Sequence, residues 1–339
     1  MDEELPPEVT DACDDDNPLL FGRVLDGKGA GRPIEWEDAK VWQPATPGEI
    51  MWVHLCRNRP GVIEWLEQLD IPEPTVELLT SDSTRPRAFR DGDTLVATMR
   101  GINFNPGAEP EDMISMQMWC DGKRLITLRR FPLQTPRHVL RMIDREEVGP
   151  SDAGALITEL AEAMITRMSS AIIDMNEHID ELEDSDHDSD DAEKMLDKIV
   201  TIRRNCLALK RHMGPMHEAL ESISRTAPPW FEEHDRREIG ESIDRLRRYL
   251  DDLDISKESA VVLQDDIRAR SIARNERTNY LLTIVAAIFL PLGFLTGLLG
   301  INVGGMPGVD DPMAFWEVVA LCGSIFVAML ILFWKWKWL

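Results

Sequence analysis

The sequence lacks the signatures of the common nucleotide-using and nucleophile-bearing enzymes. It has no G-x-x-x-x-G-K-[ST] phosphate-binding loop, which disfavours ATP as an energy source. No G-x-S-x-G motif or Cys/His nucleophile arrangement stands out, and residues 20–150 hold no recognisable catalytic constellation. We therefore expect a protein that is not an enzyme and that needs no bound cofactor.

Basic residues are also in short supply. The 339 residues include 37 Lys and Arg against 61 Asp and Glu, a formal net charge of −24. A chain this acidic is not expected to bind nucleic acid, because the phosphates would be repelled, and its field attracts cations. The alternative, that the charge serves only solubility, is equally consistent with the composition.

Cysteines are few and scattered, and none forms a C-x-x-C pair. We expect all of them to be reduced structural thiols in a cytosolic setting. Residues 1–18 are acidic and contain no hydrophobic core segment, so they resemble neither a signal peptide nor a transit peptide and predict a disordered lead-in. The five cysteines are Cys13, Cys56, Cys120, Cys206 and Cys322.

Charged residues are absent from Leu281 to Gly300. As a helix this stretch spans about 30 Å, the thickness of the hydrocarbon core of a bilayer. A second apolar run, from Val318 to Trp334, is long enough to return to the starting side. The sequence therefore predicts two transmembrane helices, over residues 280–300 and 315–334, joined by a loop over residues 301–314.

Lysine and arginine are missing from the loop between the two predicted spans. The nearby basic residues all lie before the first span or in the tail over residues 335–339, which places both termini in the cytoplasm. These residues are Arg268, Arg270, Arg274, Arg277, Lys335 and Lys337.

Most of the chain lies outside the two spans. Residues 19–150 mix apolar runs with turn signals, which is typical of a cytosolic α/β domain. Residues 151–230 carry apolar side chains at three- and four-residue steps and predict a long antiparallel helical hairpin, although Gly214-Pro215 is expected to break its second helix. Residues 231–279 predict a stalk helix that continues into the first span. The fold class expected is an α+β membrane protein.

The first predicted span is not uniformly apolar. One face carries small or polar residues around one large apolar side chain, and it includes a G-x-x-x-G spacing that permits close helix approach. A plain anchor does not need such residues, so the pattern favours a pore-lining helix; an anchor that dimerises through its glycines is the alternative. The pore-lining stripe consists of Asn279, Thr283, Ala286, Leu290, Gly293 and Gly297.

The loop after this span carries candidate cation ligands. Asn302 side chains repeated around an oligomer would offer carbonyl oxygens to an incoming cation without the tight binding of a carboxylate ring. Asp310, Asp311 and Glu317 would form an outer acidic ring that concentrates divalent cations, or they only mark the non-cytoplasmic end.

No resident metal site is indicated elsewhere. The acidic segment Glu181–Glu193 fails the calcium-loop pattern and is better interpreted as a solvated hinge. No histidine pair has the H-E-x-x-H spacing of a zinc site.

The run from Phe289 to Asn302 resembles the CorA superfamily of divalent-cation channels. It has a proline in the helix and Gly-Ile-Asn at residues 300–302, and a short acidic loop, a second span and a basic-aromatic tail follow. That family usually has Gly-Met-Asn. The variant with Ile301, followed by Gly-Gly-Met-Pro-Gly at residues 304–308, is similar to the ZntB-type zinc-transporting branch.

The resemblance implies a funnel-shaped homopentamer in the bacterial inner membrane. It implies that the first span lines the pore, that the second lies outside it, and that Gly300, Ile301 and Asn302 form the pore entry. It further implies transport of Zn²⁺ driven by a proton gradient, with a Mg²⁺ or Co²⁺ channel as the alternative. Uptake is the expected direction, and efflux is the alternative. A membrane-anchored scaffold without transport would need the same stalk but neither the glycines in the span nor the Gly-Ile-Asn motif.

Overall fold

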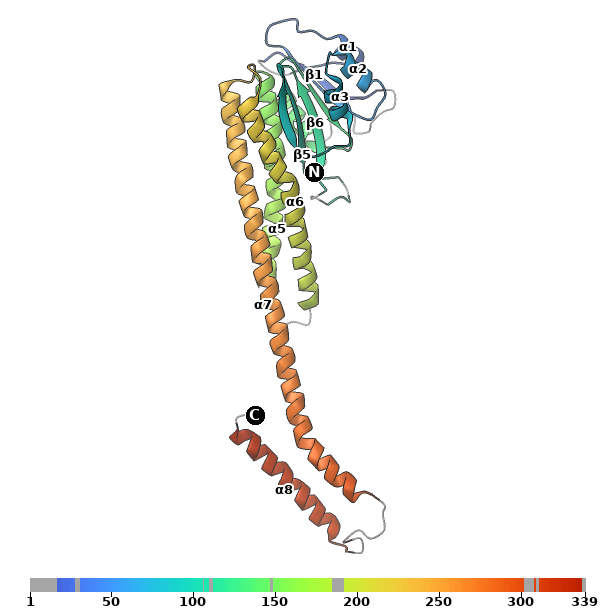
Figure 1. Cartoon of the computed structure of the whole chain (residues 1–339), viewed down its shortest axis with the longest axis vertical. Helices are drawn as coiled ribbons and strands as arrows, with labels where there is room; N and C mark the ends of the chain where they lie inside the picture. The colour runs from blue at the N-terminus through green and yellow to red at the C-terminus, as the bar shows by residue number, and fades with distance from the viewer. Residues whose placement is uncertain are drawn as a thin grey trace. The chain divides into compact units, whose positions relative to one another are not determined.

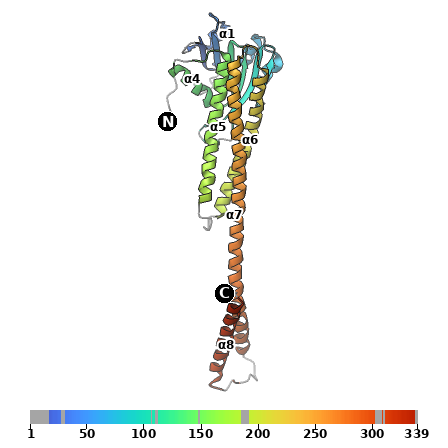
Figure 2. The same ribbon diagram turned by 90° about the vertical axis from the view of Figure 1, so that its left-hand side faces the viewer.

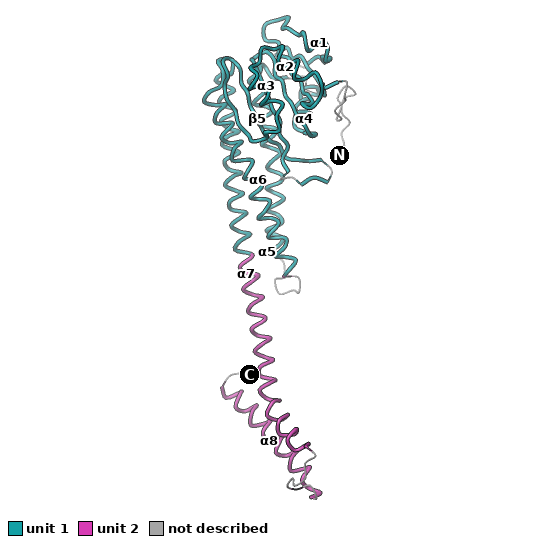
Figure 3. The backbone as a smooth tube through the Cα atoms, turned by 45° about the vertical axis from the view of Figure 1, so that its right-hand side comes forward, with its two compact units in different colours: residues 1–185, 193–263 teal, residues 186–192, 264–339 magenta. Residues whose placement is uncertain are grey.

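The computed structural model divides into two compact units (Figure 3). The first comprises residues 1–185 and 193–263, and the second comprises residues 186–192 and 264–339. The first unit therefore combines the sheet and most of the helical hairpin. The sequence predicts these as two separate domains. The structure describes residues 17–27, 31–105, 107–109, 112–146, 149–184, 192–301, 308 and 311–336.

A mixed sheet is the core of the first unit (Figure 1). It has seven strands, in the order β2-β1-β3-β7-β6-β5-β4. Strands β3 and β7 pair in parallel, and the other neighbours are antiparallel. Every residue of β1, β3 and β6 is buried, because helices cover both faces of the sheet. The strands are β1 Leu19–Leu25, β2 Arg32–Pro33, β3 Ile50–Cys56, β4 Arg87–Asp91, β5 Thr94–Gly101, β6 Ile114–Cys120 and β7 Arg124–Arg129.

Three short helices cover one face of this sheet. Trp65 and Leu66 of α2 are buried in a core cluster with Val53 and Leu55 of β3. On the other side, α5 packs against β5, and α4 is tied to β1 by an ion pair of 3.0 Å between Arg23 and Asp144. The four helices are α1 Trp36–Val41, α2 Val62–Gln68, α3 Glu73–Thr80 and α4 Gln134–Glu146.

Two tight turns of the sheet meet Trp230, which lies in the connection before α7. Asp121 and Gly122 lie in the β6–β7 turn, and Gly122 adopts a φ of +86°, which only glycine adopts without strain. The indole Nε1–H of Trp230 donates a hydrogen bond of 2.7 Å to the carbonyl oxygen of Asp93, in the β4–β5 turn. This tryptophan therefore fastens the helical part of the unit to the sheet.

Replacing Gly122 with alanine is expected to destabilise the protein more than the same change at Gly92. Both glycines have positive φ, which costs an alanine about 1–2 kcal/mol. A Cβ on Gly122 would in addition lie 2.7 Å from Cγ of Trp230, whereas nothing lies within 4 Å of a Cβ on Gly92. Thermal unfolding of the two full-length variants in detergent measures the difference, and equal midpoints would contradict the tight packing of Trp230.

Three long helices complete the first unit: α5 Ala153–Asp184, α6 Ala192–Thr226 and the beginning of α7 Glu233–Leu299. They lie alongside one another (Figure 2) and are joined by polar contacts. Arg245 of α7 pairs with Glu162 of α5 at 3.0 Å, and Lys210 of α6 pairs with Asp254 of α7. Leu246 and Leu253 of α7 are buried in this part of the unit.

The predicted break in the second hairpin helix is wrong. Helix α6 continues through Gly214 and Pro215 to Thr226. Met213 and Met216 on either side are fully buried, so packing of the helix compensates for the backbone hydrogen bond that a proline cannot donate.

The cysteines follow expectation only in part. Cys120, Cys206 and Cys322 are free thiols, and burial raises the pKa of Cys206 to about 11, which keeps it protonated. Cys56 is disulfide-bonded, so the prediction of a reduced thiol is wrong at this position. Cys13 lies outside the described residues.

Candidate functional site

The second unit contains the rest of α7 and the whole of α8, Ala314–Lys335. Both helices are long and apolar enough to cross a membrane. Only 11% of the most apolar window of α7, and none of that of α8, is buried. A core helix of a soluble protein would bury such a window, so we interpret the two helices as membrane spans.

One face of the α7 span packs on α8. Ile284 and Ile288 of α7 form a small core with Phe333 of α8. The helix continues through Pro291 and ends at Leu299, as the sequence predicts. Partly buried residues around this core are Ala287, Leu292, Met329 and Leu330.

The predicted pore-lining stripe lies on the opposite face. At about 100° per residue, its six positions fall within about 40° of Asn279, whereas Ile284 and Ile288 lie about 140° and 180° away. Leu290 is 74% exposed, and a Cβ on Gly293 or Gly297 would meet no atom within 4 Å. Packing within the chain therefore does not explain why this face is small and polar. The exposed stripe residues are Asn279, Thr283, Ala286, Leu290, Gly293 and Gly297.

The polar groups of the span are bonded to its own backbone. The hydroxyl of Thr283 donates to the carbonyl oxygen of Asn279 at 2.7 Å, and that of Thr296 donates to Leu292 at 3.0 Å. Each hydroxyl oxygen keeps its acceptor lone pairs. The stripe can thus present oxygen to a hydrated cation at Thr283.

Several residues of the predicted pore entry lie at or beyond the edge of the described residues. The N–H of Gly300 donates to Thr296 at 2.9 Å and closes the end of α7, and Ile301 is 46% exposed. Asn302 and Asp310 lie outside the described residues. Of the predicted acidic ring, Glu317 is exposed in the first turn of α8.

Asp311, the other described member of that ring, has a structural role. Its Oδ1 accepts the N–H of Met313 at 2.8 Å, just before α8 begins. One oxygen of this carboxylate therefore closes a turn that leads into the helix.

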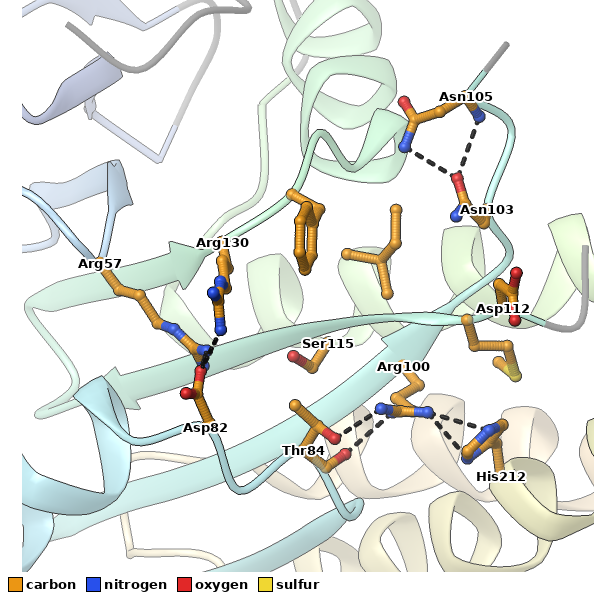
Figure 4. A pocket seen from close by; sticks show the side chains of 13 residues that line it. Arg57, Asp82, Thr84, Arg100, Asn103, Asn105, Asp112, Ser115, Arg130 and His212 are labelled. Atoms are coloured by element: carbon orange, nitrogen blue, oxygen red, sulfur yellow. Dashed lines mark hydrogen bonds and ion pairs between the residues drawn. The ribbon is translucent and has the colours of Figure 1, made fainter. Parts of the chain in front are cut away.

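A separate polar cavity of about 580 Å³ lies in the first unit, against the sheet (Figure 4). Its charged groups are engaged with one another: Arg57 and Arg130 both pair with Asp82. The sequence gives no signal for this cavity, because its walls come from distant segments. The lining residues include Arg57, Asp82, Thr84, Arg100, Asn103, Asn105, Asp112, Ser115, Arg130 and His212.

Arg100 of β5 and His212 of α6 face each other in this cavity (Figure 4). Nη1 of Arg100 lies 2.9 Å from both ring nitrogens of His212, and Nη2 donates to the hydroxyl of Thr84. Burial, and then the charge of Arg100, lower the pKa of His212 to about 4, so the imidazole is neutral at pH 7 and can accept a hydrogen bond. The pair holds α6 on the sheet.

A third cluster, of polar side chains, could not be recognised from the sequence. Asp152, His234 and Asp235 converge within the first unit, although more than eighty residues separate Asp152 from the other two. The only local signal is the position of each near the start of a long helix, where an acidic residue usually serves as a cap.

Comparison with known proteins identifies the chain. The family model described as CorA-like Mg²⁺ transporter protein matches residues 47–335. The chain belongs to the CorA-like transporter family. The resemblance inferred from the Gly-Ile-Asn motif is thereby confirmed, and the CorA-like fold, with an N-terminal α/β domain, long helices and two C-terminal apolar helices, is present here.

Relatives cover nearly the whole CorA-like chain. The divalent cation transporter CmaX of Pseudomonas aeruginosa is 34% identical over 327 residues, 96% of this chain and 98% of that protein. The zinc transport protein ZntB of Pectobacterium carotovorum is 33% identical over 309 residues, 89% of this chain and 91% of that protein. The solved structure of full-length CmaX superposes with a TM-score of 0.82 at 33% identity, covering 96% of this chain and all of that chain.

Proposed function

We propose that this CorA-like protein transports a divalent cation, and that its main activity is uptake of Zn²⁺. The observation that supports this most is the small, polar face of α7, which points away from α8 and is left exposed by the chain's own packing. A face of this kind suits the wall of a water-filled pathway.

The pathway requires several copies of the chain. Two helices cannot enclose a polar path by themselves, so the α7 faces of neighbouring subunits must surround it. Family resemblance favours a homopentamer, a funnel in which α8 lies outside α7. Residues 19–279 would lie in the cytoplasm with both termini, and the loop over residues 301–314 would face the other side of the bacterial inner membrane.

The pore entry would consist of Gly300, Ile301 and Asn302. Asn302 would offer amide oxygens to the arriving ion, and Asp310, Asp311 and Glu317 would attract it to the mouth. Resemblance to the zinc-transporting branch, together with a ZntB relative at 33% identity, supports Zn²⁺. The resemblance alone favours a proton gradient as the driving force. The family description, CorA-like Mg²⁺ transporter protein, favours Mg²⁺ transport as the second candidate. The resemblance to CorA channels adds Co²⁺ to it.

Uptake into liposomes that contain the purified protein distinguishes these candidates. We expect Zn²⁺ flux to exceed Mg²⁺ flux and to rise when a proton gradient is imposed. Mg²⁺ flux that ignores protons would identify an ordinary CorA-like channel in which Ile301 is a neutral variation. No flux of any divalent ion would contradict transport and favour a membrane-anchored scaffold.

A further inference from the structure

Three potential metal ligands converge at the start of α7. Nε2 of His234 lies 3.0 Å from Oδ1 of Asp235 and 3.9 Å from Oδ2 of Asp152. The three ligand atoms all lie within 4.8 Å of one another. Two ligand atoms of a tetrahedral Zn²⁺ are roughly 3.4 Å apart, because bonds from zinc to nitrogen and oxygen are about 2.0–2.2 Å long. The observed spacing therefore fits one shared ion with only small movements.

Helix capping accounts for only one of the two oxygens of each carboxylate, Asp152 and Asp235. Oδ1 of Asp152 accepts the N–H of Ala155 at 2.9 Å, and Oδ2 of Asp235 accepts the N–H of Glu232 at 2.8 Å. These bonds fix both carboxylates and leave the other two oxygens turned toward His234. A metal site needs ligands that are oriented in this way by a second set of partners.

The buried oxygen Oδ1 of Asp235 is a second, independent indication that an ion binds here. Asp235 is completely buried, and this oxygen has no hydrogen-bond partner. The neighbouring imidazole of His234 would balance its charge only when protonated. Burial, with the charge of Asp152 adding to it, raises the pKa of Asp235 to about 6 against the lowering effect of the N–H of Glu232. A bound cation would satisfy a buried carboxylate oxygen in this position.

The cluster is tightly packed on one side and open to solvent on the other. A Cβ on Gly154 would collide with Oδ2 of Asp235, so a glycine is required where α5 passes this carboxylate. The side chains of His234 and Asp152 are 43% and 32% exposed, which opens the cluster to solvent on one side. The hydroxyl of Ser151 donates to Oδ2 of Asp152 at 3.0 Å, a contact near the surface that water could replace.

Nearby acidic groups offset the partial positive charge at the starts of α5 and α7, which would otherwise repel a cation. Oε2 of Glu232 lies 3.7 Å from Nδ1 of His234, and Glu238 adds negative charge at Asp235. With Nε2 toward the ion, Nδ1 carries the proton and faces this carboxylate, the usual arrangement behind a metal-bound histidine.

We propose that Asp152, His234 and Asp235 form a Zn²⁺-binding site in the cytosolic unit, with water completing the coordination. One imidazole and two carboxylates suit a borderline transition metal, whereas Mg²⁺ prefers oxygen ligands alone. Such an ion ties the start of α5 to the start of α7. The proposal concerns ion binding and does not depend on transport.

Equilibrium dialysis of metal-free, full-length protein against radioactive Zn²⁺ in detergent tests the site. The informative variant is His234→Gln, because glutamine is polar and close to histidine in size but is a poor zinc ligand. The matched control is His178→Gln, an exposed histidine more than twenty residues along α5. We expect His234→Gln to bind one Zn²⁺ fewer per chain than the wild type, and His178→Gln to bind the full number.

Two further measurements exclude a merely structural effect. His234→Cys should restore the lost Zn²⁺, since a thiolate is a good zinc ligand, and excess Mg²⁺ should not compete for it. Zn²⁺ should also raise the thermal unfolding midpoint of the wild type more than that of His234→Gln. Equal Zn²⁺ binding by the wild type and His234→Gln, or displacement of this ion by Mg²⁺, would overturn the proposal and leave the two aspartates as helix caps. Flux in liposomes, which reports on the pathway in the membrane, is scored separately.

Discussion

The Gly293→Leu variant is expected to lose divalent-cation flux by about tenfold or more while its chain still folds. Gly293 lies on the exposed face of α7, opposite the contact with α8, and an added Cβ meets no atom of its own chain. A leucine there costs the single chain nothing in packing, but repeated around an oligomer it would fill the pathway. Flux of Zn²⁺ into liposomes, normalised to the amount of folded protein, gives the result.

The matched control for this variant is Gly323→Leu, in α8. A Cβ on Gly323 also meets no atom within 4 Å, so the two substitutions are equivalent within the chain. In the proposed arrangement α8 lies outside α7, and Gly323→Leu should keep most of the flux. Equal flux in the two variants would argue that the α7 face lines no pathway.

The Asn302→Ala variant is expected to cause a loss of similar size by a different route. An alanine removes the amide oxygen that would meet the arriving cation, so entry slows although the pathway behind it stays open. Initial rates of Zn²⁺ uptake, measured over a range of Zn²⁺ concentrations, report this change. Unchanged uptake would remove Asn302 from the pore entry.

The Asn302→Asp variant tests the same position by replacing the amide with a carboxylate. A ring of carboxylates binds a divalent cation more tightly than a ring of amides, so half-saturation should move to lower Zn²⁺ while the maximal rate falls. If both parameters match those of the wild type, the side chain at this position does not contact the ion.

Local sequence patterns predict the elements of this fold well. The uncharged run after Tyr280 and the apolar steps between Leu156 and Ile179 each correspond to a helix, because burial or a bilayer demands an apolar face with helical spacing. The failure at Gly214-Pro215 has a tertiary cause, since two buried methionines hold α6 together across the proline.

The candidate sites are predictable to different degrees. The stripe on α7 is a property of one helix, so its spacing alone places its six residues on one face. That α8 takes the opposite face is new information, because contacts between helices cannot be derived from the period of either one. The cluster around Asp235 depends on a contact between the starts of α5 and α7, and no pattern local to Asp152 or to His234 reveals it.

The division into domains is less visible in the sequence than its elements are. The change in composition after Pro150 predicts a boundary there, yet α5 packs on β5 and Trp230 is bonded to the β4–β5 turn. These contacts make the sheet and the helical bundle one unit.

The most direct test of the account is a thiol-accessibility scan of the α7 span. Single cysteines are placed at Thr283, Ala286 and Leu290 on the stripe, and at Ile284 and Ile288 on the face toward α8, in a protein that carries Cys322→Ser. A charged, membrane-impermeant thiol reagent is then added during Zn²⁺ uptake into liposomes. The account predicts that the reagent blocks flux at the three stripe positions and leaves flux unchanged at Ile284 and Ile288. Block at the α8-facing positions, or at none of the five, would contradict a cation pathway along this face.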